Sequence, residues 1–276
     1  MTMEALPTLQ ISEADWATLD PQAARADRLI FYGVAVSSFL EITIEHYTAA
    51  LRVVFRGEPE VLEWLDRVWE PEERAHGHAM RAYLARVWPA YDWERAYAGF
   101  IGKYAPLCAA DLMRPTPARE MLARCVTECQ AAVLYRTLAS LAADPLARSL
   151  FQRMYEEEVS HYKYFYRWFR ILREREQLGA MRVFRDIVVR QRLAKGEDFD
   201  IALAHVEHGF CGNMPFAPLE RASISIMART ALEDHFPFDT ARAMMLKPLR
   251  ACESWRGNAL AAAMDAFYRI GQRVVV

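Results

Sequence analysis

The side chains whose types and spacing are best suited to chemistry are four glutamates and two histidines. They repeat one pattern twice. Each copy consists of a single glutamate, a long gap and then the motif Glu-x-x-His. On a helix, residues three apart lie on one face, so each motif presents a carboxylate and an imidazole together. Four carboxylates and two imidazoles are the ligand set of two metal ions inside a four-helix bundle. The predicted ligands are Glu41, Glu73, His76, Glu128, Glu158 and His161.

The donor types indicate which metal ions these side chains would bind. Carboxylates can bridge two cations, whereas each imidazole binds one. An oxygen and nitrogen set of this size suits iron or manganese better than zinc, which takes fewer ligands and often sulfur. Two reduced iron ions can share the electron demand of O2 reduction. The sequence therefore predicts two iron ions, with manganese or a mixed manganese–iron pair as the alternative, and O2 as co-substrate.

Proline and N-cap signals divide the first two thirds of the chain into four long helices. The connecting region 89–116 should contain one short helix over 93–104. Pro71 lies inside the second long helix, so we expect a kink or a restarted helix just before Glu73. The four predicted helices span 21–55, 60–88, 117–142 and 145–177.

The turns of the two predicted hairpins place the ligands at one height. In an antiparallel hairpin, facing residues lie equally far from the turn. The midpoint between the two acids of the first copy is Gly57, in the first turn, and that of the second copy is position 143, directly before Asp144-Pro145. At about 1.5 Å per residue, every ligand pair lies about 22 Å from its hairpin end. Two hairpins joined by one long crossover are the connectivity of a ferritin-like four-helix bundle, and we therefore predict an all-α fold of that type.

The remaining third of the chain also shows helical patterns and no alternating strands. Because no linker is evident, we predict a single all-α domain over 1–276. Its metal-binding bundle core would occupy 20–177, and a C-terminal helical extension at 178–276 would pack on it. The helices expected in the extension span 179–194, 198–208, 217–234 and 239–271.

Two alternatives to this ligand set remain open. Glu45 lies one helical turn after Glu41, and its hairpin midpoint also falls near the turn, so Glu45 is the alternative first ligand. The acids and histidines could instead be exposed residues of amphipathic helices. Against that interpretation, Glu41 and Glu128 stand in mostly apolar stretches, where a buried carboxylate is costly without a cation.

Composition narrows the expected partners and location. The net charge of −2 and the absence of a basic stripe give no reason to expect nucleic acid. Five scattered cysteines without a Cys-x-x-Cys pair argue against a disulfide framework or a zinc ribbon. The N-terminus lacks a basic region followed by an apolar run, and no apolar stretch of about eighteen residues occurs. We therefore expect a cytoplasmic protein without a membrane span.

The residues around the motifs resemble one family. The run RVWEPEERAHG from Arg67 to Gly77, followed by Tyr83-Leu84, resembles the second core helix of the soluble acyl-carrier-protein desaturases, Trp-x-x-Glu-Glu-x-x-His. The run MYEEEVSH from Met154 to His161 is similar to their fourth helix. The resemblance extends over about 30–175. It implies a di-iron bundle that takes electrons from a ferredoxin and oxidises a fatty acyl chain.

The resemblance also implies roles for individual residues. It makes the six predicted ligands the metal centre and implies no further catalytic residue. Glu157 would support a ligand histidine, and Trp69 occupies the family's tryptophan position, although a core aromatic is the alternative. The plant enzymes carry Thr and Arg where this chain has Ala131 and Ser160. These differences leave desaturation, hydroxylation, N-oxygenation and C–C cleavage open as outcomes.

The favoured hypothesis is an O2-activating di-iron oxidoreductase that acts on an apolar substrate, either a small molecule or a carrier-bound acyl chain, as a homodimer. One alternative is a ferritin-like ferroxidase or iron-binding protein, which the long C-terminal region disfavours. Another is a manganese–iron oxidase like the radical-generating subunit of ribonucleotide reductase. That chemistry needs a redox tyrosine, for which Tyr155 and Tyr162 are the nearest candidates.

Overall fold

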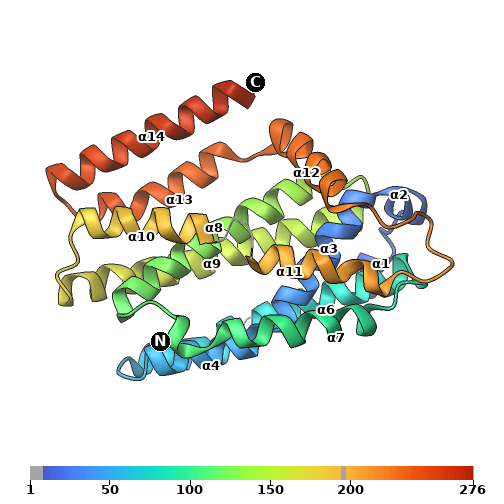
Figure 1. Cartoon of the computed structure of the whole chain (residues 1–276), viewed down its shortest axis with the longest axis horizontal. Coiled ribbons are helices and arrows are strands. Elements are labelled where there is room, and N and C mark those ends of the chain that lie inside the picture. Colours follow the sequence, from blue (N-terminus) through green and yellow to red (C-terminus); the bar gives the residue numbers. More distant parts are fainter. Residues whose placement is uncertain (1–8, 194–196, 276) are drawn as a thin grey trace. The chain divides into compact units, whose positions relative to one another are not determined.

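The computed structural model describes residues 9–193 and 197–275, and within them every regular element is helical (Figure 1). The predicted all-α fold is therefore confirmed, whereas the ferritin-like connectivity stays a prediction. None of the five cysteines forms a disulfide. Among the described residues, no single helix has the length and apolar composition of a membrane span, although the bent pair Arg28–Ile42 and Ile44–Val54 passes that test when taken together.

The helices pack into two compact units, which we call unit 1 and unit 2. Unit 1 comprises Met1–Met113, Leu138–Met154 and Glu197–Ala228, and unit 2 comprises Arg114–Thr137, Tyr155–Gly196 and Arg229–Val276. Two long helices, α8 (Pro117–Leu141) and α9 (Pro145–Arg175), contribute residues to both units. The predicted division of the chain at residue 177 stays a prediction.

Unit 1 contains the first predicted hairpin, but as more helices than the sequence suggested. The single helix expected over 21–55 is wrong, because side chains end it twice. Asp27 accepts a hydrogen bond from the Ile30 amide and so begins a new helix. Thr43 donates its hydroxyl to backbone carbonyls of the preceding turn, and the axis bends there by 43°. The resulting helices are α2 (Pro21–Ala26), α3 (Arg28–Ile42) and α4 (Ile44–Val54), after a short α1 (Glu13–Trp16).

A π-helical turn directly before Pro71 interrupts the α-helical hydrogen bonds of the second long helix, but its backbone stays helical. Helix α5 (Pro59–Trp64) passes into a π-helical turn at Leu65–Trp69, and α6 (Glu70–Val87) begins with Pro71 in its first turn. Helix α7 (Trp93–Tyr104) has the predicted bounds, and short 3-10 turns follow it at Ala105–Cys108 and Ala110–Leu112. Unit 1 also holds α11 (Glu197–Val206) with a 3-10 turn at Glu207–Gly209.

Both long helices α8 and α9 begin where Thr116-Pro117 and Asp144-Pro145 predicted. The Asp144 carboxylate accepts the Ala147 amide at 2.9 Å and the Tyr83 hydroxyl at 2.8 Å, so it caps α9 and ties it to α6 within unit 1. In unit 2, Glu176 accepts the Ala118 amide at 2.8 Å and so caps α8 from the far end of α9.

The C-terminal helices differ from expectation at one place. The helices α10 (Ala180–Leu193) and α12 (Arg221–His235) lie where helices were expected. The single helix expected over 239–271 is wrong, because α13 (Phe238–Arg250) and α14 (Trp255–Val275) form a hairpin. Glu253 turns the chain with a positive φ of 44°. A Cβ on Gly257 would lie 2.7 Å from the Leu249 carbonyl oxygen, so only glycine allows this approach.

Candidate metal centre

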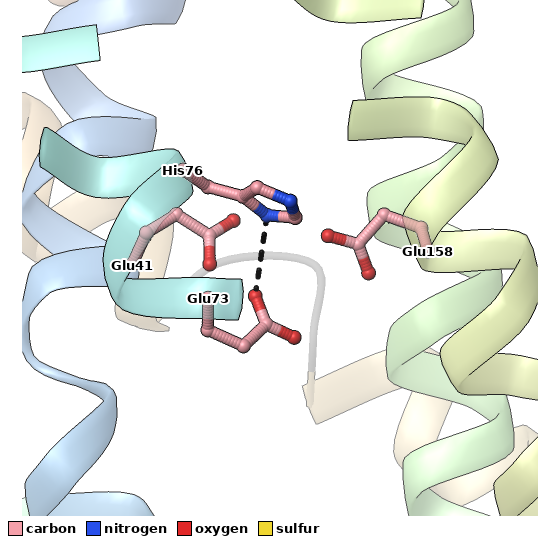
Figure 2. A group of neighbouring side chains, drawn as sticks. All are labelled: Glu41, Glu73, His76 and Glu158. Carbon is pink, nitrogen blue, oxygen red and sulfur yellow. Dashed lines mark ion pairs between the residues drawn. The ribbon is translucent and has the colours of Figure 1, made fainter. Parts of the chain in front are cut away.

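Unit 1 brings together one copy of the repeated pattern, Glu41 from α3 with Glu73 and His76 from α6. Each of these residues offers a ligand atom, and the three atoms lie within 4.8 Å of one another. The Nδ1 atom of His76 lies 3.6 Å from the nearer carboxylate oxygen of Glu73. Figure 2 shows the two carboxylates turned toward the imidazole, and it also labels Glu158 of the second copy. We call Glu41, Glu73 and His76 the first triad.

A close approach between α3 and α6 positions the first triad. Gly77 follows His76 and packs against the end of α3. A Cβ at this position would lie 2.5 Å from Ile42 Cγ1, 2.7 Å from the Ile42 amide nitrogen and 3.1 Å from the Cβ of Glu41. Because backbone cannot move aside as a flexible side chain can, only glycine permits this helix spacing. The glycine therefore sets how far the Glu41 carboxylate reaches toward α6.

Unit 2 brings together the other copy, Glu128 from α8 with Glu158 and His161 from α9. Their ligand atoms also lie within 4.8 Å of one another. His161 Nδ1 lies 3.8 Å from a carboxylate oxygen of Glu128 and 3.7 Å from one of Glu158. We call these residues the second triad. Both copies of the sequence pattern thus assemble into the same local arrangement.

Helix α9 is held in its rotation by a hydrogen bond next to the second triad. The Tyr162 hydroxyl donates to the Met244 carbonyl of α13 at 2.5 Å. Pro248 lies inside α13, four residues after Met244, and it has no amide to donate to that carbonyl. Tyr162 therefore satisfies an acceptor that the proline leaves open. The contact fixes the side of α9 that adjoins His161.

Helix α8 is held by two contacts with α10. Arg119 forms a two-pronged ion pair with Asp186, with nitrogen–oxygen distances of 2.6 and 2.7 Å. One turn before the end of α10, Arg190 donates to the Thr127 hydroxyl at 3.0 Å. Thr127 directly precedes Glu128, so this second contact lies beside the triad. Charge-assisted paired hydrogen bonds of this kind fix geometry as well as adding stability.

Five of the six ionisable groups in the triads are buried, and Glu41 is partly exposed. The exposed fraction is 4% for Glu73, 2% for Glu128 and 1% for Glu158, and both histidines are almost fully buried. Within each triad two carboxylates face one imidazole, which can supply at most one positive charge. Burying such an excess of negative charge is costly unless a cation balances it. A divalent ion in each triad would provide that balance.

The distances within the triads also fit a shared ion. Separations of 3.6 to 3.8 Å between histidine nitrogen and carboxylate oxygen are too long for hydrogen bonds. Two ligand atoms that each lie about 2.1 Å from one ion are about 3.0 Å apart at a right angle, about 3.6 Å apart at 120° and about 3.8 Å apart at 130°. The donor atoms of both triads are therefore spaced as ligands of one ion would be, and the residues fit a hard or borderline divalent metal.

The other residues singled out by the sequence lie outside these two triads. Glu45 is exposed and follows the bend after α3, whereas Glu41 precedes it. Trp69 is 1% exposed and ends the π-helical turn. Glu157 is half-buried. Ser160, at the position where the plant desaturases carry arginine, is exposed.

Sequence reasoning missed the residues that position the triads. Gly77 was visible only as part of a motif, since the space around a glycine cannot be read from one chain. Tyr162 was considered only as a redox candidate, yet Pro248 four residues after Met244 is a readable signal that a carbonyl needs another donor. A comparison with protein-family models, with curated proteins and with solved structures found no match.

Proposed function

We propose that the two triads together hold two iron ions as one dinuclear centre, and that the protein is an O2-dependent oxidoreductase. The observation that carries this proposal is the duplication itself, a glutamate with a Glu-x-x-His pair assembled twice, with every ligand buried except the partly exposed Glu41. In this proposal α3, α6, α8 and α9 are the four helices of a ferritin-like bundle. Helix α9, which carries Glu158 and His161, is one continuous helix that begins in unit 1.

The chain's own residues would bind, orient and shield the reacting groups. When bound, a pair of iron ions supplies the electrons and open coordination positions that O2 reduction needs. Six anchored ligands leave such positions available, because two ions commonly take more than six ligands. Burial of the five ligands other than Glu41 keeps bulk water away from most of the site, which strengthens electrostatic interactions inside. An apolar substrate, free or as a carrier-bound acyl chain, suits this environment, and a ferredoxin-type donor and a homodimeric cytoplasmic form belong to the same proposal.

Metal stoichiometry is the first test of the proposal. Elemental analysis of iron-loaded protein should give about two ions per chain, and Glu158→Gln, which keeps the shape but removes the charge, should lose at least one. Glu156→Gln is the matched control, because Glu156 is exposed and lies two residues away on the same helix. Full retention of two ions in Glu158→Gln would refute the ligand assignment. Metal loss in both variants would point to general damage of α9.

Oxygen chemistry is tested separately with the loaded protein. A chemical or ferredoxin-based reductant and O2 are supplied with free and carrier-bound acyl chains, and the products are measured by mass spectrometry. A mass loss of two hydrogens or a gain of one oxygen in an organic product supports the proposal. Consumption of O2 with accumulation of ferric iron and no organic product would overturn it in favour of a ferroxidase.

A further inference from the structure

Unit 2 contains a cavity of about 640 Å³ whose wall is mostly apolar. The wall is supplied by the helices α8, α10, α13 and α14, together with Phe236 from the segment before α13. No charged residue is among the described side chains that line it. A volume of this size matches the pockets that enclose small organic ligands. The apolar lining includes Val133, Phe184, Val188, Met245, Met264 and Phe267.

A small group of uncharged polar side chains lies within this apolar wall. Gln191 of α10 donates a hydrogen bond to the Tyr268 hydroxyl of α14 at 3.0 Å, and both residues line the cavity. Among the described hydrogen bonds Tyr268 only accepts, so its hydroxyl proton can be donated to a ligand. Burial raises the pKa of Tyr268 to about 12, which keeps that proton in place at neutral pH. A few polar groups converging inside an apolar pocket are the usual signature of a ligand site.

The cavity is separate from the second triad. Cys129, Gln130 and Val133 of α8 line it. At about 100° per residue, these three positions centre roughly 150° around the helix from Glu128. The face of α8 that meets the cavity therefore turns away from the face that carries the metal ligand. Cys129 itself is occupied, since its thiol donates to the Ala241 carbonyl of α13.

We propose that this cavity binds an uncharged, largely apolar molecule that carries a hydrogen-bond acceptor such as a carbonyl group, at a site separate from the second triad. The apolar wall would bury the body of the molecule, and the Tyr268 hydroxyl would donate to its acceptor. A carboxylate would be a poor occupant, because the lining offers no positive charge to balance it. Ligand binding at this site does not require bound metal, so it can be tested independently of the proposed di-iron function.

A neutral fluorescent dye with a carbonyl group, Nile red, can probe the cavity in the full-length protein. The titration should show one dye per chain. Val188→Trp should weaken binding at least tenfold by filling the cavity, whereas Val53→Trp makes the same change at an exposed position of unit 1 and should leave binding unchanged. Ala263→Trp at the exposed rim of the cavity is a second blocking variant that the fold should tolerate.

Competition against the dye tests the chemical class of the occupant. The ketone 2-dodecanone should displace Nile red at least tenfold more effectively than dodecanoate. Tyr268→Phe should weaken the ketone by about threefold to tenfold, the range expected for one lost hydrogen bond, and should leave dodecane unaffected. Equal displacement by ketone and carboxylate would overturn the assignment of an uncharged ligand. Unchanged dye affinity in both Val188→Trp and Ala263→Trp would show that the dye does not bind in this cavity and would overturn the proposed site.

Discussion

Replacement of Gly77 by alanine tests whether a close helix contact positions the first triad. The added Cβ would lie 2.5 Å from Ile42 Cγ1 and 2.7 Å from the Ile42 amide nitrogen. Ordinary carbon contacts begin at about 3.5 Å, so the end of α3 must retreat by about 1 Å. The Ile42 side chain can rotate away, but its amide nitrogen is part of the α3 backbone. Glu41, which directly precedes Ile42, must therefore move with it.

The effect on stability should be smaller than the effect on metal binding. Overpacking a core contact costs about 1–3 kcal/mol, and alanine recovers about 1 kcal/mol of helix propensity over glycine. The net destabilisation should therefore be between about zero and 2 kcal/mol. A shift of about 1 Å in the Glu41 carboxylate is about half the length of a metal–oxygen bond. Metal sites tolerate displacements of this size poorly. We expect the affinity for one of the two ions to fall by about 10- to 100-fold.

The assay is a titration of metal-free protein with Fe(II), or with Co(II) as a spectroscopic substitute, combined with thermal unfolding. Gly102→Ala is the matched control, because Gly102 lies in α7 and a Cβ added there would meet no neighbouring atom within 4 Å. This variant should bind metal normally with unchanged or raised stability. Glu41→Ala gives the reference for complete loss of that ligand. If Gly77→Ala binds two ions with wild-type affinity, the contact does not position Glu41 and the reasoning fails.

Three further changes probe the supports of unit 2 and the buried phenols. Tyr162→Phe leaves the Met244 carbonyl without its donor and should cost about 1–3 kcal/mol in calorimetry, whereas an unchanged melting temperature would mean that water replaces the hydroxyl. Arg119→Met leaves the buried Asp186 carboxylate without its partner and should destabilise by about 3–5 kcal/mol in denaturant unfolding, so a loss below about 1 kcal/mol would contradict the pairing. Burial raises the pKa of Tyr91 above its usual 10.0, so the unfolded chain loses the phenol proton at a lower pH than the folded protein does. The free energy of unfolding should therefore fall as the pH rises above about 10. Tyr91→Phe should make that alkaline decline shallower, and an identical slope in both proteins would refute this source.

The sequence predicted the parts of the fold that depend on local signals. Pro117 and Pro145 each stand in the first turn of a helix, where the missing amide costs nothing, and both helices begin there. The bend after α3 had no such signal. The bend depends on the Thr43 hydroxyl, which donates hydrogen bonds to carbonyls of its own helix. Threonine forms such bonds in some helices only, so its presence does not predict a bend. That bend separates Glu41 from Glu45, which the sequence alone left open as alternative ligands.

The C-terminal hairpin shows that a local helix-breaking signal does not always mark where a helix ends. Pro248 is a helix breaker by its chemistry, yet α13 continues through it to Arg250. Tyr162 compensates for the missing amide by donating to the carbonyl that Pro248 leaves open. The chain turns only afterwards, between Arg250 and Trp255, where Gly257 allows α14 to return closely past α13. The break was therefore decided by packing between distant segments, which no local rule describes.

The two triads share one pattern but are positioned by different means. The first depends on a close steric contact, because Gly77 lets the end of α3 approach α6. The second depends on directed bonds from the C-terminal helices, through Tyr162 to α13 and through Thr127 to α10. A hydrogen bond can be removed by a substitution that hardly changes side-chain volume, whereas one added methyl group at Gly77 would push α3 and α6 apart. We therefore expect metal binding at the second triad to respond to substitutions far along the chain, in α10 and α13.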